Sequence, residues 1–236
     1  MSLDIHALSA RERIAMRCAR ELAPGQVVNL GIGMPTLTAN YLDASAGVIF
    51  HSENGVFGVG PKPPTAEVDS DLTNAGCEPI TLAPGAAIMD LATSLGAMRK
   101  GYIDVTILGA LEVDARGNLA NWATRRSGKW WPGIGGAMDL CYGTRKVIVA
   151  MSHVDKQGRP KIRRRCSLPL TGKRCVSVIV TDKAVFDVTA AGLRLREFLP
   201  GLTPGDIAAM TDAEFTLAAD ARAMALDLPP GREDAA

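Results

Sequence analysis

The chain has 236 residues, of which 47% are hydrophobic and 22% are charged. This composition supplies a sizeable core and excludes a disordered, collagen-like or coiled-coil chain. The 26 lysines and arginines nearly balance 25 acidic residues, so the net charge of +1 gives no overall attraction to nucleic acid or membranes. We predict a single domain over residues 1–236, with a loose C-terminal tail from about residue 226.

The first third of the chain is predicted to alternate helices and buried strands. Ser9 and Glu12 have the spacing of a capping box at the start of a helix, and Pro24 and Gly25 end that helix. The further elements expected here are a strand over Val27–Leu30, a glycine turn over residues 31–33, a helix over 35–42 and a strand over 48–50.

The rest of the chain is predicted to repeat this rhythm around two long loops. Residues 56–74 are rich in Gly, Pro and Asp without a clear period, and a second loop is expected over 117–136. Thr211 and Glu214 allow a capping box, whereas residues 215–217 allow a short last strand. The other expected elements are a helix over 87–98 and strands over 80–82, 103–108, 147–151, Val176–Val180, 185–188 and 193–196.

Short apolar strands that alternate with helices predict an α/β fold. We expect an open, mostly parallel twisted sheet flanked by helices. Ligands of such sheets bind beyond the C-terminal ends of the strands. The site is therefore sought where a strand ends in polar or glycine-rich sequence.

Several common chemistries have no signature in the chain. The three histidines (His6, His51 and His153) form no H-E-x-x-H motif or His/Cys cluster, so we expect no catalytic metal. No G-x-S-x-G or P-loop motif occurs, and Thr36 stands where a dinucleotide fingerprint that begins at Gly31 needs glycine or alanine.

The most informative segment is S-E-N-G at residues 52–55, directly after the strand predicted at 48–50. Glu53 leaves an apolar strand at its C-terminal end and would point into the ligand crevice. Gly55 and Gly58 let the backbone approach a bulky ligand, and Asn54 tolerates the turn. An ordinary solvated turn explains the same residues, so the pattern alone leaves both interpretations open.

The segment HSENGVFGVGP at residues 51–61 resembles the S-E-N-G motif of family I CoA transferases, specifically the B (β) subunit of 3-oxoacid or 3-oxoadipate CoA transferases. Further motifs of that family are similar to residues 29–35, 117–122, 133–140 and 168–173, so the resemblance spans roughly residues 8–215. It implies a fold like that of CoA transferases and ribose-phosphate isomerases.

The resemblance also implies a covalent mechanism. Glu53 matches the nucleophile that attacks the acyl-CoA thioester and then carries CoA as a glutamyl thioester in ping-pong chemistry. Asn29 and the backbone amides around Gly135 and Gly136 match the oxyanion hole. For Asn29, a hydrogen bond that holds its own strand-to-turn corner is an equal alternative. The residues implied to bind substrate or CoA are Gly31, Gly33, Asn54, Gly55, Gly58, Gly133, Ala137 and Arg125.

The family further implies a partner, the A (α) type of CoA-transferase chain, that completes the site in an assembly expected to be a heterotetramer. CoA is then substrate and covalent intermediate, and no permanently bound cofactor is expected. Three alternatives stay open: an acyl-CoA hydrolase on the same fold, a non-catalytic ligand-sensing or assembly protein, and a sugar-phosphate isomerase. Neither the donor nor the acid acceptor is fixed by the sequence.

Two segments have more than one interpretation. Arg125 and Arg126 would hold a second substrate carboxylate, and Trp130 and Trp131 would line an acyl pocket or a contact between chains, but surface positions explain them equally well. The basic run over residues 156–174 would meet CoA phosphates or form a solvated hairpin end. Nucleic acid is not expected, because no aromatic residue interleaves these charges.

The cysteines and the N-terminus predict a cytoplasmic protein. Five cysteines without a C-x-x-C pair favour reduced thiols. Asp4, Glu12 and Arg13 interrupt the apolar run that a signal peptide needs, and no stretch near them is apolar and long enough to span a bilayer.

Overall fold

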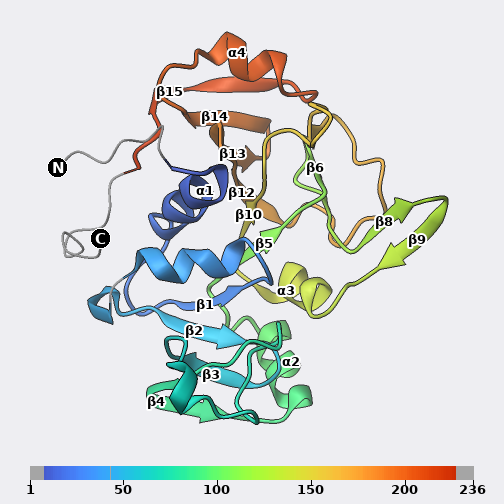
Figure 1. The fold of residues 1–236 in the computed structure, drawn as a ribbon. Coiled ribbons are helices and arrows are strands. Elements are labelled where there is room, and N and C mark those ends of the chain that lie inside the picture. The colour runs from blue at the N-terminus through green and yellow to red at the C-terminus, as the bar shows by residue number, and fades with distance from the viewer. Residues whose placement is uncertain (1–7, 43, 227–236) are drawn as a thin grey trace.

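One ten-stranded sheet forms the centre of the computed structural model, which describes residues 8–42 and 44–226. The strand order is β15-β14-β13-β12-β10-β5-β1-β2-β3-β4, so β15 and β4 lie at opposite ends of the sheet (Figure 1). The strands are β1 (Val27–Leu30), β2 (Ile49–Ser52), β3 (Val56–Val59), β4 (Leu82–Ile88), β5 (Val105–Gly109), β10 (Lys146–Ala150), β12 (Val176–Val180), β13 (Ala184–Thr189), β14 (Gly192–Phe198) and β15 (Phe215–Ala223).

The central five strands, from β12 to β2, run parallel to one another. Antiparallel pairs extend the sheet on both sides, and β15 is parallel to β14. The predicted α/β fold with an open, mostly parallel sheet is thus confirmed at its centre. The central strands are almost uniformly apolar because both of their faces are covered.

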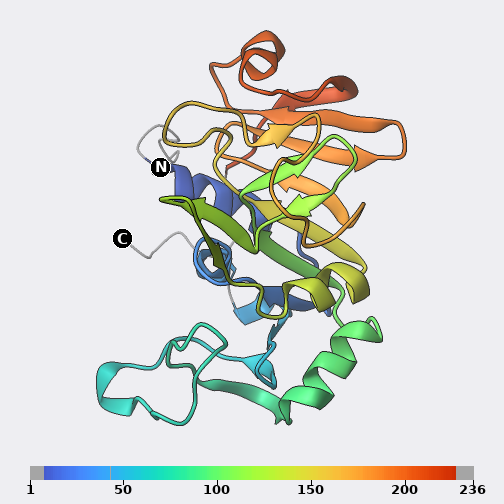
Figure 2. The same ribbon diagram turned by 90° about the vertical axis from the view of Figure 1, so that its right-hand side faces the viewer.

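Helices and loops cover the two faces of the sheet (Figure 2). Alternate residues of β5 and β10 pack into two separate cores: Ile107 and Ile148 lie with helix α1 (Ala10–Ala19), whereas Leu108 and Val149 lie on the opposite face. Helices α2 (Leu91–Arg99), α3 (Ala137–Gly143) and α4 (Pro204–Ala209) contribute Met98, Leu140 and Ile207 to that second core. The parallel sheet is therefore buried on both sides, as its apolar strands require.

The helix starts show which local signals decide the structure. The predicted capping box is confirmed: Ser9 Oγ accepts from the N–H of Glu12 (3.3 Å), and the N–H of Ser9 donates to Glu12 Oε2 (2.7 Å). Residues Pro35–Tyr41 form a 3-10 helix, η1, with Pro35 at its start. The helix predicted over 87–98 begins too early, because β4 continues to Ile88 and the Asp90 carboxylate caps α2 by accepting from the Thr93 N–H (3.0 Å).

Both predictions of a long loop were wrong in part, because each segment contains regular elements. Residues 56–74 contain β3 and a 3-10 turn, η3 (Thr65–Glu67). Outside this segment, a further 3-10 turn, η2 (Ala44–Ala46), precedes β2. Residues 117–136 contain β7 (Leu119–Ala120) and the hairpin of β8 (Ala123–Arg126) and β9 (Lys129–Pro132). In a small sheet, β6 (Glu112–Asp114) is the middle strand and pairs with both β7 and β11 (Ile162–Arg163). Near the end of the chain, the strand alternative is confirmed by β15, and Thr211 and Glu214 cap no helix.

The predicted C-terminal tail lies almost wholly outside the described residues, of which Leu226, 1% exposed, is the last. The single-domain interpretation stays a prediction. In the described part of the chain, no helix is long and apolar enough to cross a membrane.

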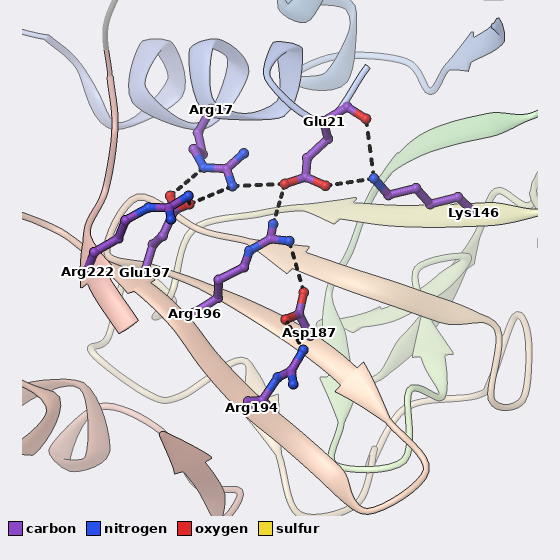
Figure 3. Close-up of polar contacts among 8 residues, drawn as sticks. All are labelled: Arg17, Glu21, Lys146, Asp187, Arg194, Arg196, Glu197 and Arg222. Atoms are coloured by element: carbon purple, nitrogen blue, oxygen red, sulfur yellow. Dashed lines mark hydrogen bonds and ion pairs between the residues drawn. The ribbon is translucent and has the colours of Figure 1, made fainter. Parts of the chain in front are cut away.

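A network of eight charged residues fastens α1 to the sheet (Figure 3). At its centre, the Glu21 carboxylate accepts from Arg17 Nη2 (2.8 Å), Lys146 Nζ (2.7 Å) and Arg196 Nη2. Arg17 also binds Glu197 on β14 through Nε (2.6 Å) and Nη2 (3.0 Å). The network continues through Asp187 on β13, Arg194 on β14 and Arg222 on β15.

This network makes stability depend on pH. Burial alone would raise the pKa of Glu21, but the hydrogen bond from Lys146 and the charges of Arg17 and Arg196 outweigh it and lower the pKa from 4.5 to about 2. Because the folded-state pKa is the lower one, the stabilisation is complete above pH 4.5 and is lost as the pH falls towards 2. Integrated over that window, it amounts to about 3 kcal/mol.

We therefore expect acid to destabilise the wild-type protein more than the Glu21→Gln variant. Urea unfolding at pH 6 and pH 3 measures both proteins, and the wild-type free energy of unfolding should fall by about 2 kcal/mol more over this range. Equal losses in the two proteins would show that the folded state does not perturb Glu21.

Candidate active site

A cavity of about 540 Å³ lies at the C-terminal ends of three adjacent parallel strands. Gly31 follows β1, Glu53 follows β2, and Gly109 ends β5, and all three residues line this cavity. The opposite wall is formed by residues 133–137, which lead into α3. The structure thus brings the S-E-N-G segment and the glycine-rich segment at residues 133–136 into one site, at the edge of the sheet where ligands of parallel sheets bind.

Asn29 holds the Glu53 carboxylate in place. The Asn29 Nδ2 donates to Glu53 Oε2 over 3.0 Å, and the Asn29 side chain is fully buried beneath the cavity. Its Oδ1 accepts from the Oγ1 of Thr106 (3.2 Å), the residue paired with it on the neighbouring strand β5. This second bond fixes which end of the amide faces Glu53, so the donor is oriented before any substrate binds.

His51 supports Asn29 from β2. It is buried, packs against the Phe57 ring at 4.3 Å between centroids, and lies 3.0 Å from the Ser94 hydroxyl through Nε2. Its Nδ1 lies 3.4 Å from the Asn29 Nδ2, which is a donor, so Nδ1 is the acceptor and the proton is on Nε2. Burial lowers the pKa of His51 to about 4, and the ring is therefore neutral at neutral pH.

The cavity wall formed by residues 133–137, here called the glycine wall, lies close to Glu53. A Cβ added to Gly136 would be 3.4 Å from Glu53 Cγ and 3.3 Å from Met98 Cε, so a larger residue would crowd the carboxylate. Gly135 has a φ of +49°, a left-handed conformation that favours glycine. Within the described residues, no group accepts a hydrogen bond from the N–H of Gly135 or Gly136. Two backbone donors without a partner among the described residues thus belong to the wall of the cavity that Glu53 also lines, as an oxyanion hole requires.

Of the other residues predicted to bind substrate, Gly31, Gly133 and Ala137 line the cavity. Gly31 is also needed for packing, because a Cβ there would lie 3.1 Å from the Ile107 carbonyl oxygen. The N–H of Gly133 donates to the Trp122 carbonyl (2.6 Å), which fixes the start of the glycine wall.

Five predicted binding residues lie outside the cavity wall: Gly33, Asn54, Gly55, Gly58 and Arg125. Asn54 donates to the Thr73 carbonyl (2.7 Å) and thereby fixes a loop. A Cβ on Gly55 would lie 2.1 Å from the Met89 oxygen, and one on Gly58 would lie 2.9 Å from Ala86. These two glycines let β3 and β4 approach each other, which is a structural reason for them independent of any ligand.

Arg125 lies on the β8–β9 hairpin, exposed to solvent. Its guanidinium stacks over the Trp130 ring, 5.0 Å from the ring centroid. Trp130 and Trp131 are 47% and 59% exposed and do not line the cavity. Binding of a substrate carboxylate by Arg125 therefore stays a prediction, without support from the cavity in this chain.

Sequence reasoning missed Asn121 and the apolar part of the wall. Asn121 Nδ2 donates to the Gly109 carbonyl (2.9 Å), and its Oδ1 accepts from Thr171 Oγ1 (2.6 Å), so it ties the end of β5 to a distant loop. Asn121 lies in the motif at residues 117–122, which was the available signal. Ile32 and Ile134 also line the cavity, and neither had a signal beyond its glycine neighbours.

The comparison with known protein families decides the identity. A family model described as Coenzyme A transferase matches residues 11–209. The chain belongs to the coenzyme A transferase family. Membership makes this CoA transferase an enzyme whose substrate is a CoA thioester, in accord with the resemblance seen in the sequence.

Two bacterial relatives of this CoA transferase are named as subunits of such enzymes. It is 46% identical over 221 residues to the beta subunit of the acetate CoA-transferase of Escherichia coli (strain K12), covering 94% of this chain and 100% of that protein. It is 46% identical over 205 residues to the B subunit of the succinyl-CoA:3-ketoacid coenzyme A transferase of Helicobacter pylori (strain ATCC 700392 / 26695). This match covers 87% of this chain and 98% of that protein.

The fold also agrees with solved structures. The apoenzyme of an acyl-CoA transferase (YdiF) from Escherichia coli O157:H7 superposes with a TM-score of 0.73 at 21% identity. The match covers 96% of this CoA transferase but 44% of that longer chain. At this identity the likeness concerns the fold alone.

Proposed function

We propose that this chain is the catalytic subunit of a CoA transferase that moves CoA from an acyl-CoA donor, such as succinyl-CoA, to a 3-oxo acid. The observation that carries the proposal is the Glu53 carboxylate, bound by Asn29 at 3.0 Å in a cavity that Gly135 and Gly136 also line, with N–H groups that have no partner among the described residues. A positioned nucleophile and unoccupied oxyanion donors on one cavity wall suit acyl transfer.

In the first half-reaction, a Glu53 oxygen attacks the thioester carbonyl carbon and the CoA thiolate leaves, which gives a mixed acyl–glutamyl anhydride. The thiolate then attacks the Glu53 carbonyl carbon, releasing the donor acid as a carboxylate and forming the glutamyl-CoA thioester. The acceptor carboxylate reverses these two steps and leaves as the new acyl-CoA. A carboxylate nucleophile needs no separate base, so no proton is transferred in any step.

In the proposed mechanism, two sets of donors share the oxyanion stabilisation. When Glu53 attacks the substrate, negative charge develops on the substrate carbonyl oxygen, which the N–H groups of Gly135 and Gly136 would bind. When thiolate attacks Glu53, the charge develops on an oxygen of Glu53 itself. Asn29 Nδ2 is already 3.0 Å from Oε2 and would stabilise that second oxyanion.

We further propose that a second chain, of the A (α) type, completes this site in a cytoplasmic heterotetramer. The two bacterial relatives described above are named as B or beta subunits, which supports a partner. Ile32, Ile134 and Met138, at or next to the cavity wall, are 66%, 37% and 58% exposed, and a partner there would cover them.

The partner would also contribute to substrate choice. The relatives are named for different acids, acetate in one case and a 3-ketoacid in the other, at the same 46% identity. Glu53 is the one charged residue among those that line the cavity, so no cation of the described residues faces an acceptor carboxylate there. We infer that a cation from the partner recognises that group.

Product analysis tests the proposed function. The chain is co-expressed with a candidate partner of the A type and supplied with succinyl-CoA, with or without acetoacetate. We expect acetoacetyl-CoA only when acetoacetate is present, and little free CoA in its absence. Release of CoA at the same rate without acetoacetate would establish the hydrolase instead. A folded, assembled complex without either activity would favour the non-catalytic role.

A further inference from the structure

A second cavity, of about 570 Å³, lies against the small sheet β11-β6-β7 and the segment that follows it. Four of its lining side chains are cationic, namely Arg116, Arg164, Arg165 and Lys173. Three of these belong to the basic run at residues 156–174, and Arg116 comes from the turn between β6 and β7. The volume falls within the range of small-molecule sites.

The positive charge of this cavity is not neutralised. Among the residues that the structure describes, no carboxylate pairs with Arg116, Arg165 or Lys173. The Arg164 Nε donates to the backbone carbonyl of Asp212 (3.0 Å). The neighbouring Arg163 differs, because its Nε lies 4.0 Å from Glu112 and 3.8 Å from Asp212.

Asp114 is the one acidic residue among the described residues that line the cavity, and its carboxylate is already engaged. It is 2% exposed and accepts from the N–H groups of Arg116 (3.0 Å) and Asn118 (3.1 Å) through Oδ1. Its Oδ2 accepts from Asn118 Nδ2 (2.8 Å) and the Cys166 N–H (3.3 Å). These four donors disperse its charge into the turn, so the surface of the cavity presents cations to a ligand.

We propose that this basic cavity binds the phosphate groups of a small molecule. Arginine guanidinium groups bind phosphate oxygens in pairs of parallel hydrogen bonds, and a lysine adds a point charge. A concave surface concentrates that charge, whereas the same residues on an open hairpin would be screened by solvent.

The basic cavity adjoins the active-site cavity. On the segment that contains β6, Leu111 lines the active-site cavity and Asp114 lines the basic cavity. On the segment that contains β7, Asn121 lines the active-site cavity and Asn118 lines the basic cavity. Three residues of extended chain span about 10 Å. One elongated ligand can therefore place its reacting end at Glu53 and its phosphates among the cations. Acyl-CoA has this chemistry, and naming it as the source rests on the proposed function; a separate phosphate-bearing molecule is the other source.

The test uses the double variant Arg165→Glu with Lys173→Glu. The matched control is Lys156→Glu, which reverses an exposed charge of the same basic run outside the cavity. Calorimetry measures binding of adenosine 3′,5′-bisphosphate and of pyrophosphate to the assembled enzyme. We expect the double variant to bind both probes at least tenfold more weakly than wild type, and the control to bind within twofold of it. Equal binding by all three proteins would overturn the proposal.

Steady-state kinetics distinguishes the source of the phosphate. If CoA is the ligand, the double variant should raise the KM for acyl-CoA at least tenfold, with kcat and the KM for the acid little changed. Acyl-pantetheine, which lacks these phosphates, should then react equally well with both proteins. Weakened probe binding with an unchanged KM for acyl-CoA would establish the site for a separate phosphate compound. Calorimetry measures binding without turnover. If the enzyme has no transferase activity, the proposed function is refuted, but the calorimetric test of phosphate binding can still be carried out.

Discussion

Replacement of Glu53 by glutamine should lower kcat by on the order of 10⁴-fold or more, the scale expected when a covalent nucleophile is removed. The amide preserves the size of the side chain, but its oxygen is a far weaker nucleophile than a carboxylate. Turnover of acyl-CoA with an acid acceptor measures this loss. Glu67→Gln, which changes an exposed carboxylate on η3 outside the cavity, should keep wild-type activity.

Chemical trapping adds an independent readout for the same residue. Wild-type enzyme incubated with acyl-CoA and then with borohydride or hydroxylamine should carry its modification on the peptide that contains Glu53. The Glu53→Gln variant should carry none, with an unchanged unfolding midpoint. Full turnover in Glu53→Ala, or label on another carboxylate, would remove Glu53 as the nucleophile.

Replacement of Asn29 by alanine should lower kcat about 10²- to 10³-fold, the usual cost of losing one oxyanion donor. The loss arises because Asn29 Nδ2 is positioned on Glu53 Oε2 before reaction. Formation and breakdown of the glutamyl-CoA thioester, each followed in a single turnover, should both slow, because both steps pass through an oxyanion on Glu53 itself. Slowed formation with an unchanged rate of breakdown would assign Asn29 to positioning of Glu53 alone.

Thr106→Val is the matched control for Asn29. It keeps the shape of a buried residue on β5 and removes the 3.2 Å hydrogen bond to Asn29 Oδ1. Loss of one neutral hydrogen bond predicts an effect of about fivefold on kcat, well below that of Asn29→Ala. If the folded Asn29→Ala enzyme keeps the wild-type kcat, Asn29 is no oxyanion donor, and its role is to hold the corner between its own strand and the following turn.

The sequence predicts those elements of this fold whose signals are local. The Ser9 and Glu12 spacing sets the first helix, and the largely apolar runs of β1, β10 and β12 mark the buried parallel strands. Helix α4 was not predicted, although its signal is local: Thr203 and Asp206 form a capping box with Pro204 at the first turn. The sequence alone is sufficient to predict an element wherever one capping residue or one apolar segment determines that element.

Local signals fail where tertiary contacts override them. Pro84 and Gly85 lie within β4, and Gly58 lies within β3, so both strands have the composition of loops. Their pairing is possible because Gly58 leaves room for Ala86 in the facing strand. Proline is tolerated in β4 because this strand ends the sheet and has a free edge.

The candidate active site, like the fold, could be predicted from the sequence only where the signal is local. A strand that ends in Glu53 predicts a carboxylate at the edge of the sheet, which the structure confirms. No spacing predicts that residues 133–137 lie opposite it, since they are about eighty positions further along the chain. The family resemblance provided that link. The roles of His51 and Asn121 depend on contacts with Ser94 and Thr171, which only the folded structure places beside them.

The strand order also has a consequence for biosynthesis. β1 pairs with β5, whose partner residues lie 77 positions later in the chain, and β5 pairs in turn with β10. Non-local pairings of this kind form slowly, and the growing polypeptide exposes apolar strands until they close. Glu53 therefore emerges from the ribosome long before α3 can reach it, and the catalytic centre is assembled only after more than half of the protein has been translated.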